Sequence, residues 1–403
     1  MITNQFNKYP HGFYFFNIEK LKQNYDAMSE AFSKRFSSFS IAYSYKTNYT
    51  PYLCKILKDK GAIAEVVSEM EMKLALTLGY EGKKIIYNGP FKSIESIKTA
   101  LFNGVTIHVD SLDELKNIIS VSDIVKPKTV NLGLRLNFEM KGEKRSRFGL
   151  DINSDELIKS IDLIDSHKFS LIGIHCHHPF RDLPSFQERM KRICSFCNKM
   201  GRQLKYIDLG GGFFSPMTND LATSMGVKHV NYDQYADFMY QEFKNSWSLE
   251  YEPTLIIEPG SALVADVFDF YTRVVSIKKI ENLKIATLTG SKFNILPNSK
   301  KTINLPLKVF KMNNSNSENE IEVYNLCGYT CIESDVMYEG FVGTLNKGDI
   351  IRFNNVGSYS VVMKPPFILP NYPILCDDNF GGFKEVKCSE SYEYIFQNFN
   401  FNL

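Results

Sequence analysis

The feature that most constrains the fold is an alternation of short apolar runs with amphipathic segments along residues 40–265. In the amphipathic segments, such as 68–79 and 93–104, apolar residues recur at helical spacing. The two patterns alternate about eight times over roughly 225 residues, which is typical of a (β/α)8 barrel of the TIM type. A doubly wound parallel sheet is the alternative fold. The apolar runs span residues 40–45, 63–68, 84–88, 106–110, 130–137, 171–178, 206–213 and 254–260.

The ends of the predicted helices support this division. Ser111 precedes Leu112-Asp113-Glu114, a pattern that predicts a capping box at the start of a helix. Gly79 and Gly104 stand where two helices are expected to stop. Pro51 is suited to the first turn of a helix that follows the run 40–45.

The pattern changes after about residue 270, where strand-like runs follow one another without a long helix between them. These runs span residues 270–280, 284–290, 305–312, 321–328 and 348–363. The sequence therefore predicts a second, all-β domain. The polar segment 313–320 is predicted to be a mobile loop within it.

Composition excludes several classes of protein. The 403-residue chain is 44% apolar and 23% charged, as in ordinary globular proteins, and its net charge of +2 gives no reason to expect nucleic acid or an acidic membrane as a partner. No apolar run approaches the roughly 20 residues that span a bilayer. The N-terminus lacks an export signal, and the eight scattered cysteines do not resemble a disulfide framework, so a cytoplasmic location is expected. Cys194 and Cys197 are expected to face the core from one helix.

In such a barrel the chemistry lies at the carboxyl ends of the strands. The sequence motifs of serine hydrolases and zinc proteases are absent, and no metal site is predicted. The strand ends carry Lys46, Glu65 with Ser68, Asn88, Asp110, Arg135, His175 with His177, Gly210-Gly211-Gly212, and Glu258-Pro259-Gly260.

Three of these features favour pyridoxal 5′-phosphate (PLP) as a cofactor. Lys46 is either a solvated strand end or a partly desolvated amine that condenses with an aldehyde. The glycines at 210–212 form either a tight turn or a loop whose backbone N–H groups approach an anion. Glu258 ends an apolar strand and is expected to be partly buried. Together these residues suit PLP: the lysine would condense with its aldehyde, the glycines would bind its phosphate, and the carboxylate would face its pyridine nitrogen.

Nine motifs, matching in order and spacing over almost the whole chain, resemble the fold-type III PLP-dependent decarboxylases, typified by ornithine and diaminopimelate decarboxylases. The resemblance implies a barrel at residues 25–268 and a β-sandwich or barrel-like domain formed by residues 1–24 with 269–403. The motifs are YSYKTN, AEVVSEMEMKLALTLG, IIYNGPFKS, LRLN with SRFGLD, LIGIHCHH, IDLGGGF, IIEPGS, CGYTCIESDVMYEG and GDIIRFNNVGSYS.

The resemblance also implies roles for residues of these motifs. Lys46 would bind PLP, His177 would stack on its ring, and Glu258 would pair with its pyridine nitrogen. Cys331 would donate a proton to the decarboxylated carbon in the active site of a second subunit, so a homodimer with shared active sites is implied. His175 and His178 are expected to be structural or to lie at the rim. The phosphate would be bound by Gly210, Gly211, Gly212, Gly260, Ser261 and Tyr359, and the substrate by Arg135, Ile332, Glu333 and Asp335.

The chain departs from the family pattern at four places. Ser261 replaces an arginine after Glu-Pro-Gly, and residues 178–180 replace a Gly-Ser, so two phosphate contacts change. Residues 289–299 lack the Arg…Leu-Tyr pattern with which diaminopimelate decarboxylases hold the distal end of their substrate. Ile332 replaces the acidic residue that faces the distal ammonium, although Glu333 is a substitute if the loop is shifted.

An apolar side chain cannot compensate a buried ammonium. The leading hypothesis is therefore a substrate whose distal amine is acylated, such as citrate-coupled ornithine or diaminopropionate in carboxylate siderophore biosynthesis. Free diaminopimelate, ornithine or lysine is the alternative. Two alternatives belong to other classes of protein. The first is an amino-acid racemase, and Glu258 argues against it. The second is a non-catalytic binding protein, and the presence of both Lys46 and Cys331 argues against it.

Overall fold

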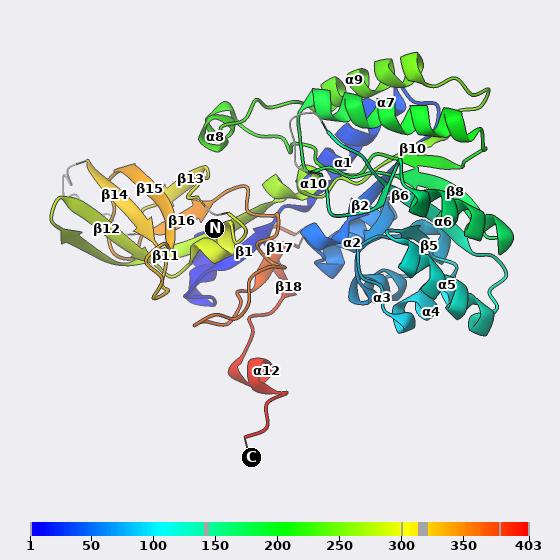
Figure 1. The fold of residues 1–403 in the computed structure, drawn as a ribbon. Helices are drawn as coiled ribbons and strands as arrows, with labels where there is room; N and C mark the ends of the chain where they lie inside the picture. The colour runs from blue at the N-terminus through cyan, green and yellow to red at the C-terminus, as the bar shows by residue number, and fades with distance from the viewer. Residues whose placement is uncertain (1, 141–144, 300, 313–320, 379, 402–403) are drawn as a thin grey trace. The chain divides into compact units, whose positions relative to one another are not determined.

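The computed structural model describes residues 2–140, 145–299, 301–312, 321–378 and 380–401, so the loop predicted at 313–320 lies outside the described residues. The chain divides into two units. One comprises Lys22–Phe214 and Val230–Ala262, and the other Met1–Leu21, Ser215–His229 and Leu263–Leu403. We call them the barrel unit and the β-unit (Figure 1).

The barrel unit contains the predicted (β/α)8 barrel. Its strands pair in parallel in the order β5-β4-β3-β2-β10-β9-β8-β6, and pairing of β5 with β6 closes the ring. The short strand β7 (Leu150–Asp151) is added beside β6. The eight strands are β2 (Phe39–Ser44), β3 (Ile63–Val66), β4 (Ile85–Tyr87), β5 (Thr106–Val109), β6 (Asn131–Asn137), β8 (Ser170–His175), β9 (Tyr206–Asp208) and β10 (Thr254–Ile257).

Helices surround this ring (Figure 1). Pro51 occupies the first turn of its helix, as predicted. The short helix α10 (Ser261–Val264) and helix α1 (Ile18–Ser33) cross from one unit to the other. The remaining helices are α2 (Pro51–Asp59), α3 (Glu69–Thr77), α4 (Ile94–Asn103), α5 (Leu112–Val125), α6 (Asp155–Ser166), α7 (Leu183–Met200) and α9 (Tyr232–Ser246), with 3₁₀ turns η2 (Tyr45–Thr47) and η3 (Gly82–Lys84).

The capping box predicted at Ser111 is only half correct. The Ser111 hydroxyl accepts a hydrogen bond from the backbone N–H of Glu114, as expected of an N-cap. The Glu114 carboxylate, however, accepts from Lys92 Nζ at 2.9 Å, and the Lys92 side chain is fully buried. A buried ammonium needs an anion, so Glu114 serves this lysine. Gly104 caps α4 in the left-handed conformation, as predicted.

The β-unit is mostly sheet, as predicted, and the N-terminal strand belongs to it. Strand β1 pairs antiparallel with β11 and parallel with β17. The sheet order is β15-β14-β12-β11-β1-β17-β18, with β16 beside β11 and β13 beside β16. The strands are β1 (Phe13–Phe16), β11 (Phe268–Ile280), β12 (Leu283–Leu288), β13 (Leu307–Phe310), β14 (Glu322–Cys327), β15 (Val336–Gly343), β16 (Ile350–Phe353), β17 (Ile374–Asp377) and β18 (Phe383–Lys387).

Short helical segments complete the β-unit. Helix α8, which the sequence pattern did not predict, ends at Gly226 in a left-handed cap. The segments are η1 (Ile2–Asn7), α8 (Asn219–Met225), η4 (Ala265–Val267), α11 (Lys292–Ile295) and α12 (Tyr392–Phe396).

Apolar packing holds each unit together. In the β-unit, Phe13 stacks on Tyr271 with ring centroids 4.9 Å apart, and Phe16 stacks on Phe268 at 4.8 Å. Cys194 and Cys197 are buried on α7, which confirms that both face the core. All eight cysteines are free thiols. Among the described helices, none combines the length and hydrophobicity that crossing a bilayer requires.

Candidate active site

A cavity of about 250 Å³ lies in the barrel unit and brings together residues from the carboxyl ends of several strands. Four residues to which the sequence analysis gave roles contribute to its wall: Lys46, Arg135, His177 and Glu258. His175, expected to be structural or to lie at the rim, also lines it. The remaining lining residues are Glu65, Val67, Asn88, Gly89, Pro90 and Phe148.

Lys46 lies in the turn η2, two residues after β2, and is held by a buried carboxylate. Its Nζ lies 2.7 Å from Glu65 Oε2 and 2.6 Å from Ser44 Oγ. The lysine side chain is 39% exposed, whereas the Glu65 side chain, on the adjacent strand β3, is fully buried. Lys46 is therefore not a solvated strand end. Its amine is anchored on one side and open to the cavity on the other.

Asn88 joins this ion pair to Glu258. Its Nδ2 donates to Glu65 Oε1 at 3.0 Å and to Glu258 Oε1 at 2.6 Å. Asn88 follows β4 and Glu258 follows β10, and both side chains are buried. One amide therefore fixes the separation of two carboxylates that arise from opposite parts of the sequence.

Two histidines lie beside Glu258 and the glycine loop. His175 Nε2 lies 3.3 Å from Glu258 Oε2. His177 Nδ1 accepts a hydrogen bond of 3.1 Å from the backbone N–H of Gly211, which leaves the proton of the neutral ring on Nε2. Burial lowers the pKa of both histidines well below the usual value, so both rings are neutral near pH 7.

The loop Gly210-Gly211-Gly212 packs so closely that larger residues do not fit. Gly210 adopts a φ of +68°, and a Cβ at Gly211 would lie 2.4 Å from the carbonyl oxygen of Glu258. Arg189 of α7 ties this loop to the unusual segment 178–180, because its guanidinium donates to Gly211 O at 2.8 Å and to Phe180 O at 2.5 Å. The fully buried Arg189 has no counterpart in the sequence-based prediction.

A buried polar cluster, which the sequence did not reveal, shares His175 and Glu258 with the wall of the cavity. The ligand atoms of His108, His175, Asp208 and Glu258 all lie within 4.8 Å of one another, and such a group is able to hold a metal ion. His108 and Asp208 received no role from the sequence. Their position in strands that end at the active site was the available signal, but it does not distinguish them from core residues.

The β-unit contains five of the other predicted site residues, whereas Gly260 and Ser261 belong to the barrel unit. Cys331, Ile332 and Glu333 are exposed. Asp335 is buried and binds its own loop, accepting from the backbone N–H of Lys292 at 2.7 Å and from Thr330 Oγ1 at 2.6 Å. We therefore expect Asp335 to shape the loop that carries Cys331.

Tyr359 has a φ of +66°. A left-handed backbone at a bulky residue is strained and is found mainly where function requires it. Five other described non-glycine residues also have a positive φ, so the role of Tyr359 as a phosphate ligand stays a prediction.

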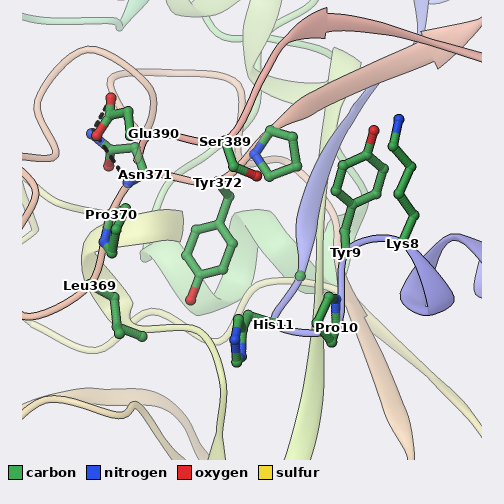
Figure 2. A pocket seen from close by; sticks show the side chains of 12 residues that line it. Lys8, Tyr9, Pro10, His11, Leu369, Pro370, Asn371, Tyr372, Ser389 and Glu390 are labelled. Carbon is green, nitrogen blue, oxygen red and sulfur yellow. Dashed lines mark hydrogen bonds between the residues drawn. The ribbon is translucent and has the colours of Figure 1, made fainter. Parts of the chain in front are cut away.

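A second cavity, of about 170 Å³, lies within the β-unit between residues 8–12 and 369–373 (Figure 2). Its polar side chains serve the surrounding structure. Tyr9 Oη donates to Glu385 at 2.5 Å, Asn371 Nδ2 donates to Glu390 at 3.0 Å, and Tyr372 Oη donates to the carbonyl of Thr289. These contacts make the cavity a weaker candidate for catalysis than the barrel site.

The residues around the barrel cavity fit PLP. The same cavity is lined by the amine of Lys46 for the aldehyde, the buried carboxylate of Glu258 for the pyridine nitrogen, and the neutral imidazole of His177 for one face of the ring. The glycine loop, in which a Cβ at Gly211 has no room, lies directly against Glu258 and His177. The buried Oδ1 of Asn88 and Nδ1 of His175 have no hydrogen-bond partner among the described residues. Two polar atoms at this site are therefore available to a bound molecule.

Comparisons with known proteins agree with this geometry. Residues 19–265 match the family model "Pyridoxal-dependent decarboxylase, pyridoxal binding domain". The chain is 26% identical to the diaminopimelate decarboxylase of Methanocaldococcus jannaschii, over 87% of this chain and 82% of that protein. It is 27% identical to that of Archaeoglobus fulgidus, over 84% of this chain and 81% of that protein.

A solved structure shows the same fold. The diaminopimelate decarboxylase of M. jannaschii in complex with L-lysine superposes with a TM-score of 0.86 at 24% identity, over 98% of this chain and 93% of that one. Because the family model covers more than half of the chain, the family is established. The chain belongs to the pyridoxal-dependent decarboxylases and is a PLP-dependent carboxy-lyase.

Proposed function

We propose that this enzyme removes the α-carboxylate of a free diamino acid, and that diaminopimelate is the substrate. The relatives named above support this choice over our leading hypothesis from the sequence, because they are diaminopimelate decarboxylases. The structural observation that carries the chemistry is the continuous chain of contacts Lys46–Glu65–Asn88–Glu258 around one cavity.

Each residue of this chain has a task that follows from its contacts. PLP, when bound, supplies the electron sink for the charge left by the departing carbon dioxide. Lys46 would present its amine to the cofactor, and the Glu65 carboxylate holds that amine in place when it is free. Glu258, fixed by Asn88 and His175, would keep a proton on the pyridine nitrogen. His177, whose orientation is set by the N–H of Gly211, would pack on the ring.

We assign phosphate binding to the glycine loop, Gly260, Ser261 and Tyr359. A Cβ at Gly260 would lie 2.0 Å from Thr47 Oγ1, so this glycine packs directly beside the residue that follows Lys46. Ser261 follows Gly260 directly and is the first residue of α10. In this proposal, these residues would take the place of the arginine that the family pattern has at position 261.

We further propose a homodimer in which Cys331 donates the proton to the decarboxylated carbon in the site of a second subunit. The exposed thiol of Cys331 stands on a loop that Asp335 fixes from within. A thiol held in this way is suited to proton donation.

A mixing experiment tests the shared site. Lys46→Ala and Cys331→Ala should each have little activity, whereas a mixture that has exchanged subunits should regain about a quarter of the wild-type activity. The reason is that half of the dimers are then mixed, and one of the two sites in each carries neither substitution. Activity is measured as carbon dioxide release, with unmixed variants as controls. A mixture that stays inactive although mass spectrometry shows exchange would contradict sharing.

A second candidate is a substrate whose distal amine is coupled to citrate, as in carboxylate siderophore biosynthesis. It is favoured by Ile332, which offers no charge to an ammonium where the family has an acid and is 37% exposed within the β-unit. Glu333, the next residue, is exposed and keeps a free-amine substrate possible. The two candidates differ in the charge at one end of the substrate.

A substrate panel decides between them. We expect release of carbon dioxide from meso-diaminopimelate with a kcat/KM at least about tenfold above those for ornithine, lysine and their citrate-coupled forms, because a site that binds both polar ends rejects analogues that lack one. Ile332→Asp is the matched variant. It should raise kcat/KM for substrates with a free distal amine relative to kcat/KM for the citrate-coupled ones. A preference of the wild type for a citrate-coupled form would establish the second candidate. Racemisation without carbon dioxide release would exclude decarboxylation altogether.

A further inference from the structure

Asp208 is a buried carboxyl group to which the proposed mechanism has given no task. It is the last residue of β9, its Cα pairs with that of His175 on β8, and its side chain is fully buried. Its Oδ1 accepts a hydrogen bond of 2.9 Å from the backbone N–H of Gly210, at the start of the glycine loop. Its Oδ2 is buried and has no hydrogen-bond partner among the described residues.

The nearest groups explain why Oδ2 lacks a donor. Asp208 and Glu258 both contribute to the cluster whose ligand atoms lie within 4.8 Å of one another. Two ionised carboxylates this close in a buried site repel each other strongly. The pKa of Asp208 is raised well above its usual range. Burial is the largest cause, and the negative charge of Glu258 is the next. One proton is therefore expected to reside on this pair of carboxyl groups.

The donors around Glu258 decide which of the two acids carries that proton. Glu258 faces Asn88 Nδ2 through one oxygen and His175 Nε2 through the other. Hydrogen bonds from donors favour the ionised form of a carboxyl group. Asp208 accepts the N–H of Gly210 on one oxygen alone. Glu258 thus faces donors through both oxygens, and Asp208, with a donor on one oxygen alone, is the better site for the proton.

The two histidines of the cluster do not replace this proton. Burial lowers the pKa of His108 and His175 well below the usual value, so neither ring is a cation near pH 7. His108 Nε2 is engaged with Tyr206 Oη at 2.6 Å. The titratable groups that act on Asp208 or on its immediate partners are Glu258, Glu65, Tyr206, His108, His175, Cys176, Lys46, Lys92 and Arg135.

From this geometry we propose that Asp208 is a neutral carboxylic acid that donates a hydrogen bond from Oδ2 to Glu258, and so acts as a positioning residue for the carboxylate that faces the cofactor ring. This inference rests on the role proposed for Glu258. Its consequence is that Glu258 receives three donors, from Asn88, His175 and Asp208. The same carboxyl group links the glycine loop, through Gly210, to the ring end of the site.

The substitutions Asp208→Asn and Asp208→Ala test this assignment. An asparagine can accept from Gly210 through Oδ1 and donate to Glu258 through Nδ2, so it replaces a carboxylic acid but not a carboxylate. We expect D208N to keep kcat within about threefold of wild type, and D208A to lose roughly 10- to 100-fold because one hydrogen bond to a charged group is removed. D208N should also keep the visible spectrum of the bound cofactor over the pH range in which D208A loses it.

Infrared spectroscopy tests the proton without turnover. The wild-type minus D208N difference spectrum should contain the carbonyl band of a neutral carboxylic acid. Asp335→Asn is the matched control and should remove no such band, because both oxygens of the buried Asp335 accept hydrogen bonds from two donors each. This readout is independent of the substrate, so it separates failure of the assignment from failure of the proposed function.

Three outcomes would overturn the assignment. The first is a D208N variant that folds, as judged by circular dichroism, and is as impaired as D208A. The second is a difference spectrum that shows a carboxylate band in place of the acid band. The third is one divalent metal ion bound per chain in the wild type and lost in D208N, because the cluster would then be a metal site.

Discussion

Replacing Lys46 with alanine is expected to lower kcat/KM for decarboxylation by at least about 10³-fold, because the enzyme loses the group that condenses with the cofactor. The same variant should lack the visible absorbance that the wild-type protein shows with PLP. The fold should survive, since Glu65 keeps hydrogen bonds from Ser44 and Asn88 after the ammonium is removed. Absorbance and carbon dioxide release are measured on the same samples.

Lys55→Ala is the matched control for this prediction. Lys55 is an exposed lysine of α2 that pairs with Asp59 one helical turn away, and such pairs contribute little. Its removal should leave both the absorbance and the activity unchanged. If K46A folded normally and still bound the cofactor with an unchanged visible spectrum, the central assignment of the site would be wrong.

The second large effect is expected for Glu258→Gln, which should lower kcat by about 10²- to 10³-fold. A glutamine has nearly the same shape and keeps an oxygen for Asn88, but it carries no charge to hold a proton on the pyridine nitrogen. The loss should therefore appear mainly in kcat, with a small change in KM. Steady-state kinetics with saturating PLP provide the measurement.

Glu242→Gln serves as the comparison, because Glu242 is a buried carboxylate of α9 that pairs with Gln187 outside the cavity. Any activity lost there reports on folding alone. An E258Q enzyme with wild-type kcat, or with a defect no larger than that of E242Q, would show that the charge of Glu258 is dispensable.

Much of the architecture was predictable from the chain. The spacing of apolar residues changes between helical and strand-like at the observed element boundaries. The reason is that each helix or strand must bury one face, and this requirement shapes the sequence of every segment. The barrel, the all-β unit and the position of Lys46 at the end of β2 follow from such patterns. The capping box at Ser111 was only partly correct because a distant buried residue, Lys92, competes for Glu114.

The active site was predictable only as a set of strand ends. Lys46 and Glu258 are separated by more than 200 residues, and the sequence does not show that Asn88 bridges the carboxylates next to them. Arg189 was missed because an arginine at one position of an amphipathic helix looks like a solvated residue, whereas the structure buries it against the glycine loop.

The sequence by itself determined which residues stand at the carboxyl ends of the strands, and therefore that an amine, a glycine loop and a carboxylate meet in one site. Only the tertiary structure decided the environment of each group: the buried partner of Lys46, the neutral histidines and the crowding of Asp208 against Glu258. The physical reason is that hydropathy patterns are local, whereas protonation and hydrogen bonding depend on neighbours that the closed barrel brings together from separate strands.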